Sequence, residues 1–237
     1  MNVAKIWVYL SASPLLWLTA TLGAYAIAER ISVRLDRHPL ANPVLIAVAI
    51  LIGLLKASST AFPVYFEGAK FVHFMLGPAT VALAVPLAEN FAEVRRNLIP
   101  MVVALLAGSA TAVASAVFMA WILGADATMI ASIAPKSVTT PIAMGISERI
   151  GGLPAVTAIL VIATGIIGAV IVTPIMNLFG IRDWAARGFA AGVSAHGIGT
   201  ARAFLVNPLA GTFAGIGMGL NGVVTALIIG LLVALFG

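Results

Sequence analysis

The sequence predicts an all-α polytopic membrane protein, and three observations carry this prediction. Hydrophobic residues make up 62% of the 237 positions, charged residues only 9%, and the mean hydropathy is +1.13. Soluble domains carry about a quarter charged residues, so this chain has too few charges to cover a surface that faces water. Apolar stretches of about 20 residues, the length that crosses a bilayer, recur along the chain. They give room for about 7–8 transmembrane segments, which we expect to form a single domain over residues 1–237.

Short stretches rich in turn residues and charge separate the candidate segments. The segments are expected at about 7–29, 40–57, 70–89, 98–123, 127–148, 154–180, 186–204 and 212–236. Two of the loops between them are basic: one carries Arg30, Arg34 and Arg37, and the other carries Arg95 and Arg96. If the second and third segments both cross, these loops share one side, which the positive-inside rule assigns to the cytoplasm. The net charge of +5 is therefore interpreted as a signal that sets the orientation of the chain in the membrane. No nucleic-acid partner is expected.

Three segments carry helix breakers at the depth of the membrane. The third contains Pro78, the fifth contains Pro135 and Pro141, and the seventh reads "GFAAGVSAHGIGTARAF". Proline removes a backbone donor and clashes with the preceding turn, and glycine weakens a helix by about 1 kcal/mol. Unwound backbone is tolerated in a membrane only where protein buries it or where it lines a watery cavity. We therefore predict broken or re-entrant helices at these three places.

The third and fifth segments share a Pro-x-[Thr/Ser]-Val pattern, at "PATV" and "PKSV". Interrupted segments in matching positions indicate an inverted-repeat transporter fold with its site at the breaks. However, two segments that each cross once, with one crossing between them, run in the same direction. Either one of them is re-entrant, or the partner of the third segment is the seventh.

Lys136 lies deep in the fifth segment, with Asp126 and Glu148 only at the segment's ends. An intramembrane charge is by default a functional hypothesis, and a cation without a counter-ion suits an anionic substrate. The hydroxyls of Ser137, Thr139 and Thr140 and the helix N-terminus at the break would add hydrogen-bond donors. The alternative is a lysine that only caps carbonyls at a helix end.

His196 and Thr200 are spaced to share a helix face, and Gly197 and Gly199 allow a close backbone approach. Histidine titrates near neutral pH, so His196 is a candidate proton carrier or carboxylate donor, or else a hydrogen-bonded core residue. Arg202 belongs to the same candidate site or anchors the segment at the interface. The three histidines lie too far apart for metal-ligand spacing, cysteine is absent, and no catalytic triad or phosphate loop is present. We expect no metal, no cofactor and no enzyme activity.

Several blocks together resemble the LrgB/CidB family of bacterial membrane proteins: "HPLANPVLIA", "GPATVALAVPL", "APKSVTTPIAM", "GGLPAVTA" and "AHGIGTARA". The resemblance implies a multi-pass protein of the bacterial inner membrane. It also implies a fold similar to transporters with broken helices, and a small LrgA/CidA-type membrane partner. Members of the family are described as holin- or antiholin-like modulators of murein hydrolases. The family includes the plastidial glycolate/glycerate transporter.

Two functions therefore compete. The first is secondary transport of small carboxylates such as glycolate, glycerate, lactate or pyruvate, with protons as one candidate coupling ion. The alternative is a holin- or antiholin-like pore component or regulator of murein hydrolases and autolysis. Polar groups concentrated at the breaks favour transport, and the glycine run from Ala210 predicts a helix–helix contact, with a homodimer as first expectation. The predicted substrate-binding residues are Pro78, Thr80, Pro135, Lys136, Ser137, Thr139, Thr140, His196, Gly197, Gly199, Thr200 and Arg202.

Overall fold

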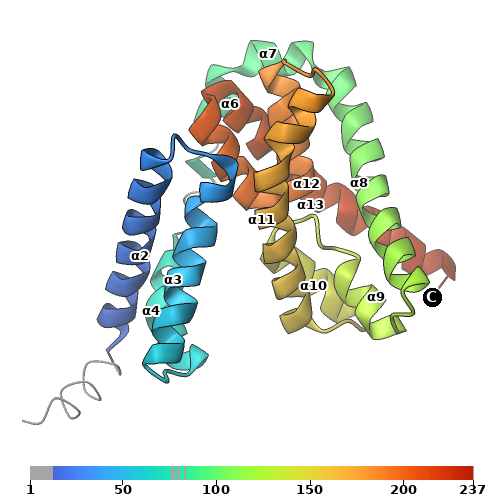
Figure 1. The fold of residues 1–237 in the computed structure, drawn as a ribbon. Helices are drawn as coiled ribbons and strands as arrows, with labels where there is room; N and C mark the ends of the chain where they lie inside the picture. Colours follow the sequence, from blue (N-terminus) through green and yellow to red (C-terminus); the bar gives the residue numbers. More distant parts are fainter. Residues whose placement is uncertain (1–12, 76–77, 79–80, 83, 237) are drawn as a thin grey trace, which may run out of the picture. The chain divides into compact units, whose positions relative to one another are not determined.

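The regular structure of the protein is entirely helical over residues 13–75, 78, 81–82 and 84–236, which a computed structural model describes (Figure 1). The prediction of an all-α fold is thereby confirmed for these residues. The chain divides into two compact units, Met1–Ala84 and Val85–Gly237, each of which is described by itself. The assignment of residues 1–237 to a single domain stays a prediction.

In the first unit, one long helix packs against two shorter ones. The elements are α2 (Pro14–Arg34), the 3-10 turn η1 (Pro39–Ala41), α3 (Pro43–Ala57) and α4 (Phe62–Phe74). Asn42 begins α3: its side-chain oxygen accepts hydrogen bonds from the Val44 and Leu45 amides, at 2.8 and 3.3 Å. Such an N-cap satisfies donors that a helix start leaves without partners.

The first part of α4, residues 62–69, lies between the segments expected at 40–57 and 70–89 and is helical where a loop is expected. Packing against α2 explains the difference. Trp17 is buried and meets the Tyr65 ring edge-on, with 5.9 Å between the ring centroids. Gly68 carries no side chain where the α2 backbone passes closely. The expected third segment is not one helix, because α4 ends at Phe74 and Met75 is a turn residue.

The second unit contains the long apolar helices of the described chain. Its elements are α6 (Ala84–Glu89, which begins one residue before the unit), α7 (Phe91–Arg96), α8 (Leu98–Ile122), α9 (Ala127–Ile133), α10 (Thr140–Arg149), α11 (Pro154–Leu178), α12 (Trp184–Val206) and α13 (Pro208–Phe236). Within the described residues, 3 helices are long and apolar enough to cross a membrane: Leu98–Ile122, Pro154–Leu178 and Pro208–Leu235. A count of 7–8 transmembrane segments stays a prediction.

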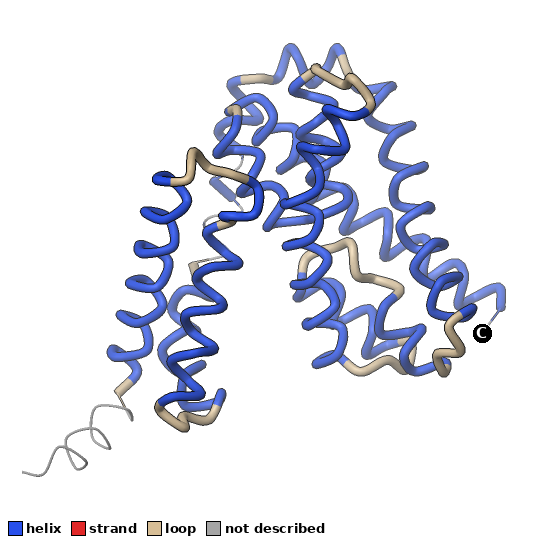
Figure 2. Tube along the Cα trace, in the orientation of Figure 1, coloured by secondary structure: helices blue, strands red, loops and turns tan. Residues whose placement is uncertain are grey.

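The segment expected at 127–148 is broken, as predicted: residues 127–149 form a hairpin of two short helices, α9 and α10. Residues 134–139 between them are not α-helical, and Figure 2 shows this stretch as a loop between the two helices. The Thr157 hydroxyl of α11 bonds to the Ser132 carbonyl of α9 at 2.9 Å and to the Ser147 hydroxyl of α10 at 2.7 Å. Both helices are therefore tied to the beginning of α11. We call residues 127–149 the first hairpin and 134–139 its tip.

Helix α12, which covers the segment expected over 186–204, is also broken as predicted and turns back on itself. Ala195 and His196 have non-helical backbone angles, and His196 has φ 40°. Beyond this tip the chain returns along its own first arm: a Cβ on Gly199 would lie 2.6 Å from the Ala191 carbonyl oxygen. Near the base, Arg202 shares a small pocket with Trp184. We call residues 184–206 the second hairpin.

The two hairpins enter the second unit from opposite ends. Helix α11 joins them, and its 25 residues span about 37 Å at 1.5 Å per residue. The first hairpin lies at the end where α8 finishes and α11 starts, which Figure 1 shows opposite α7. The second hairpin lies where α11 finishes and α13 starts. The breaks predicted for the fifth and seventh segments are therefore observed as two hairpins, whereas re-entry of these segments into the membrane stays a prediction.

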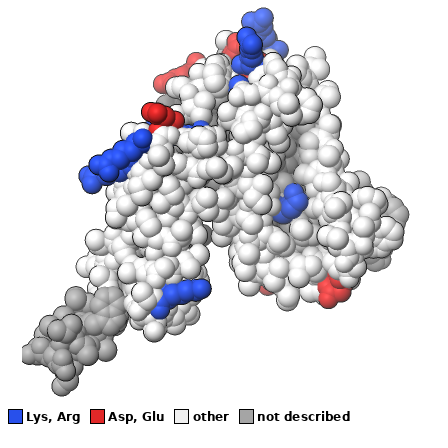
Figure 3. Space-filling view, viewed as in Figure 1, with Lys and Arg blue, Asp and Glu red and all other residues white. Residues whose placement is uncertain are grey.

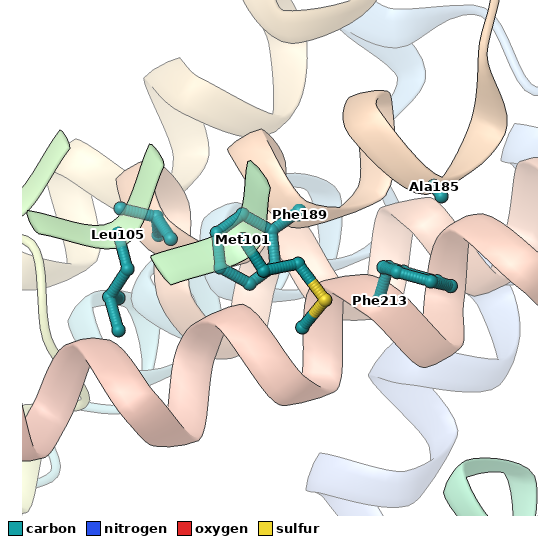
Figure 4. Close-up of a cluster of buried hydrophobic side chains, with 6 residues drawn as sticks. Met101, Leu105, Ala185, Phe189 and Phe213 are labelled. Atoms are coloured by element: carbon teal, nitrogen blue, oxygen red, sulfur yellow. The ribbon is translucent and has the colours of Figure 1, made fainter. Parts of the chain in front are cut away.

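The core of the second unit joins the second hairpin to α8 and α13. Its buried members are Met101, Leu105, Ala185, Phe189, Val193 and Phe213 (Figure 4). The hairpin reaches α13 closely because Gly188 and Gly192 face the backbone of Ala210 and Ala214. The helix–helix contact predicted for the glycine run from Ala210 is thus present within the chain.

Candidate functional site

One buried side chain joins the two hairpins. The Asn221 amide of α13 donates to the Ser137 carbonyl in the first tip, at 3.1 Å, and to the Val193 carbonyl of the second hairpin, at 2.9 Å. Its oxygen accepts from the hydroxyls of Ser109, at 2.6 Å, and Thr225, at 3.1 Å. Because Asn221 is fully buried, all four hydrogen-bonding positions of its amide are satisfied within the protein. The two tips therefore meet at a single residue.

The meeting point lies at mid-depth of the long helices. Ser109 is near the middle of α8, and Asn221 is near the middle of α13. Backbone carbonyls released by the two breaks are buried there, and Asn221 gives two of them a donor. Unpaired carbonyls at this depth would be strongly unfavourable in hydrocarbon. These two carbonyls can therefore lie at the depth of a membrane, because the buried Asn221 amide donates a hydrogen bond to each of them.

A cavity of about 720 Å³ runs along the second hairpin toward this point. At one end it is lined by Asn97 and Asp183, which precede α8 and α12. At the other end it reaches Lys136 in the first tip. The walls between are formed by α8, α11 and the first arm of α12, with Phe213 of α13. The cavity is therefore a groove, open along the exposed side chains of Ile167 and Ile171, that extends from one end of the unit to the meeting point of the hairpins.

Lys136 is partly exposed in this cavity, and its ammonium group has no ion-pair or hydrogen-bond partner within the described chain. Its neighbours Pro135 and Ser137 are buried, so the tip backbone is fixed while the ammonium group faces the cavity. Most of the surface between the helix ends is uncharged, and a basic group is visible within it (Figure 3). An uncompensated cation in low-polarity surroundings attracts an anion more strongly than it would in water.

The predicted site residues separate into distinct places. Lys136 alone among them lines the large cavity. Pro135, Ser137 and Thr139 lie in the same tip, and Thr140 begins α10. Ser137 keeps a buried hydroxyl without a hydrogen-bond partner in the described chain. Pro78 lies in the first unit, which is described separately, and Thr80 lies outside the described residues.

The predicted site residues of the seventh segment lie in the second hairpin and do not line the cavity. The His196 ring is buried, and its Nε2 lies 2.9 Å from the Val161 carbonyl of α11. Thr200 donates back to the His196 carbonyl at 2.9 Å, and Gly197 and Gly199 follow the tip. Arg202 lines a separate pocket of about 30 Å³ near the base. In this arrangement His196 anchors the hairpin, which is the core-residue alternative raised from the sequence.

The residues that organise the site were mostly missed by sequence reasoning. Asn221, Ser109 and Thr157 are buried polar residues in helices that are mostly apolar. An intramembrane polar residue is itself a signal, so Asn221 within "GLNGVV" could have been singled out. Among the described residues, no group of three or more His, Cys, Asp or Glu side chains is arranged to hold a metal ion.

Comparison with known proteins identifies the family. The sequence profile of the LrgB-like family matches residues 21–235, so this chain is a member of the LrgB-like family of membrane proteins. YwbG of Bacillus subtilis, described as an uncharacterized protein, is 38% identical over 208 residues, covering 88% of this chain and 92% of YwbG. No solved structure matches the chain.

Two further relatives have functional names. The holin-like protein CidB of Staphylococcus epidermidis is 28% identical over 228 residues, covering 96% of this chain and 98% of CidB. The antiholin-like protein LrgB of Bacillus mycoides is 29% identical over 225 residues, covering 95% of this chain and 98% of that protein. Neither name is that of an enzyme.

Proposed function

We propose that this chain is a multi-pass inner-membrane transporter of small carboxylates. One observation carries the proposal: Lys136, without a counter-ion in the described chain, faces a cavity that ends between two opposed hairpins. Binding at mid-depth between discontinuous segments is the arrangement that many secondary transporters use. The two hairpins, with their opposite entry, are our candidates for the halves of an inverted repeat, in place of the third and fifth segments.

The cavity also suggests a direction of access. Arg95, Arg96, Arg182 and Arg187 lie at the end where the cavity begins, whereas Arg149 lies at the opposite end. The positive-inside rule makes the end with more arginines cytoplasmic. In this conformation the site would therefore face the cytoplasm. A carrier must also reach a conformation that faces outward, and movement of the hairpins relative to α8 is the simplest route to it.

The relatives' names favour a second candidate function more directly than they favour transport. A holin-like or antiholin-like protein would act by forming or regulating membrane pores, together with an LrgA/CidA-type partner. Reconstitution separates the two functions. A carrier moves labelled glycolate, lactate or pyruvate into proteoliposomes, responds to an imposed pH gradient if protons are coupled, and retains a trapped dye. A pore releases the dye. Dye release with no saturable carboxylate uptake would favour the holin-like function.

Lys136→Met tests the site itself. A hydrogen bond to a charged group contributes about 1.5–3 kcal/mol, so this substitution should weaken carboxylate binding roughly 10- to 100-fold. The fold should survive, because the change removes a charge from an apolar environment. Lys136→Arg should rescue poorly, since a planar guanidinium does not replace a compact ammonium. Lys56→Met is the matched control, because Lys56 is exposed and does not line the cavity.

Binding and thermal stability should be measured on the same detergent-purified samples. Equal weakening by Lys136→Met and Lys56→Met would point to a general charge effect, and unfolding of Lys136→Met would make the lysine structural. We also propose a homodimer and an LrgA/CidA-type partner. Mass photometry of the purified protein, alone and after co-expression with a candidate partner, tests both.

A further inference from the structure

Three elements form the inner end of the cavity, and each contributes one residue. Ala112 is the last cavity residue of α8, Thr164 is the first of α11, and Lys136 lies in the first tip. Alanine offers no polar side-chain atom. The side-chain groups that can bind a polar ligand at this end are therefore the Lys136 ammonium and the Thr164 hydroxyl.

Thr164 lies at the level of the second tip. The Val161 carbonyl, nearly one turn earlier in α11, is 2.9 Å from Nε2 of His196. A Cβ on Gly165, the residue after Thr164, would lie 2.5 Å from the same ring. The Asn221 amide joins the second hairpin to the first tip, which carries the ammonium group. A carboxylate bound to the ammonium group would therefore lie near the Thr164 hydroxyl.

The Thr164 hydroxyl is available to a ligand. Hydroxyls in helices often donate to the carbonyl four residues earlier, and those of Ser132, Ser194 and Thr200 do so, at 2.7, 2.7 and 2.9 Å. Thr164 is only partly buried, and its hydroxyl has no hydrogen-bond partner within the described chain. A hydroxyl both donates and accepts, so it can bind either a hydroxyl or a keto oxygen.

We propose that Thr164 is a specificity-determining residue, which selects monocarboxylates that carry an oxygen on the carbon next to the carboxylate. The inference rests on the proposed function, whose candidate substrates glycolate, glycerate, lactate and pyruvate share this oxygen. The carboxylate lies against Lys136, and the neighbouring hydroxyl or keto oxygen bonds to Thr164. An acid that lacks this oxygen leaves the Thr164 hydroxyl without a ligand partner.

The expected preference is moderate, because the groove is open along Ile167 and Ile171. Water can enter there and bond to Thr164 when the ligand does not. The preference then equals the net contribution of one hydrogen bond, which is about fivefold to tenfold in affinity. Closed sites that bind a substrate hydroxyl reject the analogue without it much more strongly.

Isosteric pairs of acids test the role of this oxygen. Propionate and glycolate differ by a methyl in place of a hydroxyl, as do isobutyrate and lactate. Isothermal titration calorimetry of the purified full chain in detergent should show glycolate and lactate binding about fivefold to tenfold more tightly than their isosteres. Lys136→Met in the same detergent corrects for partition of the acids into micelles.

Variants of Thr164 test whether this residue produces the preference. Thr164→Val keeps the shape of the side chain and should weaken glycolate and lactate binding by about fivefold to tenfold. Propionate and isobutyrate should change by less than about twofold, because they make no bond to the hydroxyl. Thr164→Ser keeps the hydroxyl and should keep the preference. Thr164→Ala also removes the hydroxyl, and it decides the outcome if Thr164→Val does not fold.

Ser194→Ala is the matched control. Ser194 lines the same cavity, but its hydroxyl already donates to the Ala190 carbonyl at 2.7 Å. Its removal should leave the preference for glycolate over propionate unchanged.

The outcomes distinguish this inference from the proposed function. If the wild type binds both members of each pair equally, or if Thr164→Val keeps the preference for glycolate and lactate, the inference is overturned and carboxylate binding stands. An equal loss of affinity for all four acids in Thr164→Val would also overturn it, since Thr164 would then not contact the second oxygen. If none of the four acids binds a folded wild-type sample, the proposed function fails and the inference fails with it.

Discussion

The two hairpins have a similar layout but are held at opposite places. The first is fixed at its base, where the Thr157 hydroxyl bonds to both of its helices, and its long tip exposes Lys136 to the cavity. The second is fixed at its tip, where His196 is buried and contacts the Val161 carbonyl. Asn221 also bonds to the backbone of the first tip and to Val193 beside the second. Of the two tips, only the first offers a charge to the cavity.

A substitution that disrupts the packing of the second hairpin against α13 should cause the largest loss of stability. A side chain on Gly192 would overlap the Ala214 backbone of α13, and backbone cannot move aside as a side chain can. Gly192→Leu should therefore destabilise the fold by more than about 3 kcal/mol, because overpacking of this kind forces backbone shifts. Low yield of monodisperse protein and a lower thermal midpoint would report it. Gly219→Leu is the control, since nothing lies within 4 Å of a Cβ there. A stable Gly192→Leu protein would contradict the close contact.

A substitution that separates the two tips should cause the next largest loss of stability. Asn221→Asp replaces the amide that donates to Ser137 and Val193 with an oxygen that faces two carbonyls. Loss of both donors in a buried site should lower stability by about 3 kcal/mol, and carboxylate binding should fall with it because the tip that carries Lys136 is released. Thr225→Val removes one donor to the same side chain and should cost about 1 kcal/mol. Equal effects of the two substitutions would show that Asn221 does not position the tips.

The sequence predicts the breaks better than it predicts the path of the chain. Pro135 and Pro141 flank the first tip, and "AHGIG" contains the second, because proline and glycine act on the local backbone. Hydropathy cannot distinguish a broken crossing from a hairpin of the same length, so the sequence does not predict which of the two forms at 127–148 and 186–204. The partners of Asn221 lie 84 and 28 residues away. Contacts between residues so far apart in the chain are set by tertiary packing and leave no periodic pattern in the sequence.

The contact of His196 with α11, which anchors the second tip, can be tested by introducing a steric clash with the ring and then relieving it. A Cβ on Gly165 of α11 would lie 2.5 Å from Cε1 of the His196 ring. Gly165→Ala should therefore destabilise the protein by about 1–3 kcal/mol, as overpacking does. The double variant with His196→Ala should recover part of this loss, a coupling that a double-mutant cycle measures. Gly145→Ala in the first hairpin meets nothing within 4 Å and should be neutral or stabilising, since alanine is the better helix former. Additive effects would place His196 away from α11.

The smallest loss of stability is expected for a substitution at the base of the first hairpin. Thr157→Val keeps the shape of the side chain and removes the hydroxyl that bonds to Ser132 and Ser147. Because one side-chain hydroxyl is lost, the loss of stability should be about 1–2 kcal/mol, measured as the shift in thermal midpoint against exposed Thr111→Val. Adding Ser147→Ala should change little further, since its partner is already gone. Carboxylate affinity should remain within about threefold of wild type, because the base lies away from Lys136. A larger loss of affinity would mean that the base of this hairpin, as well as Asn221, sets the position of its tip.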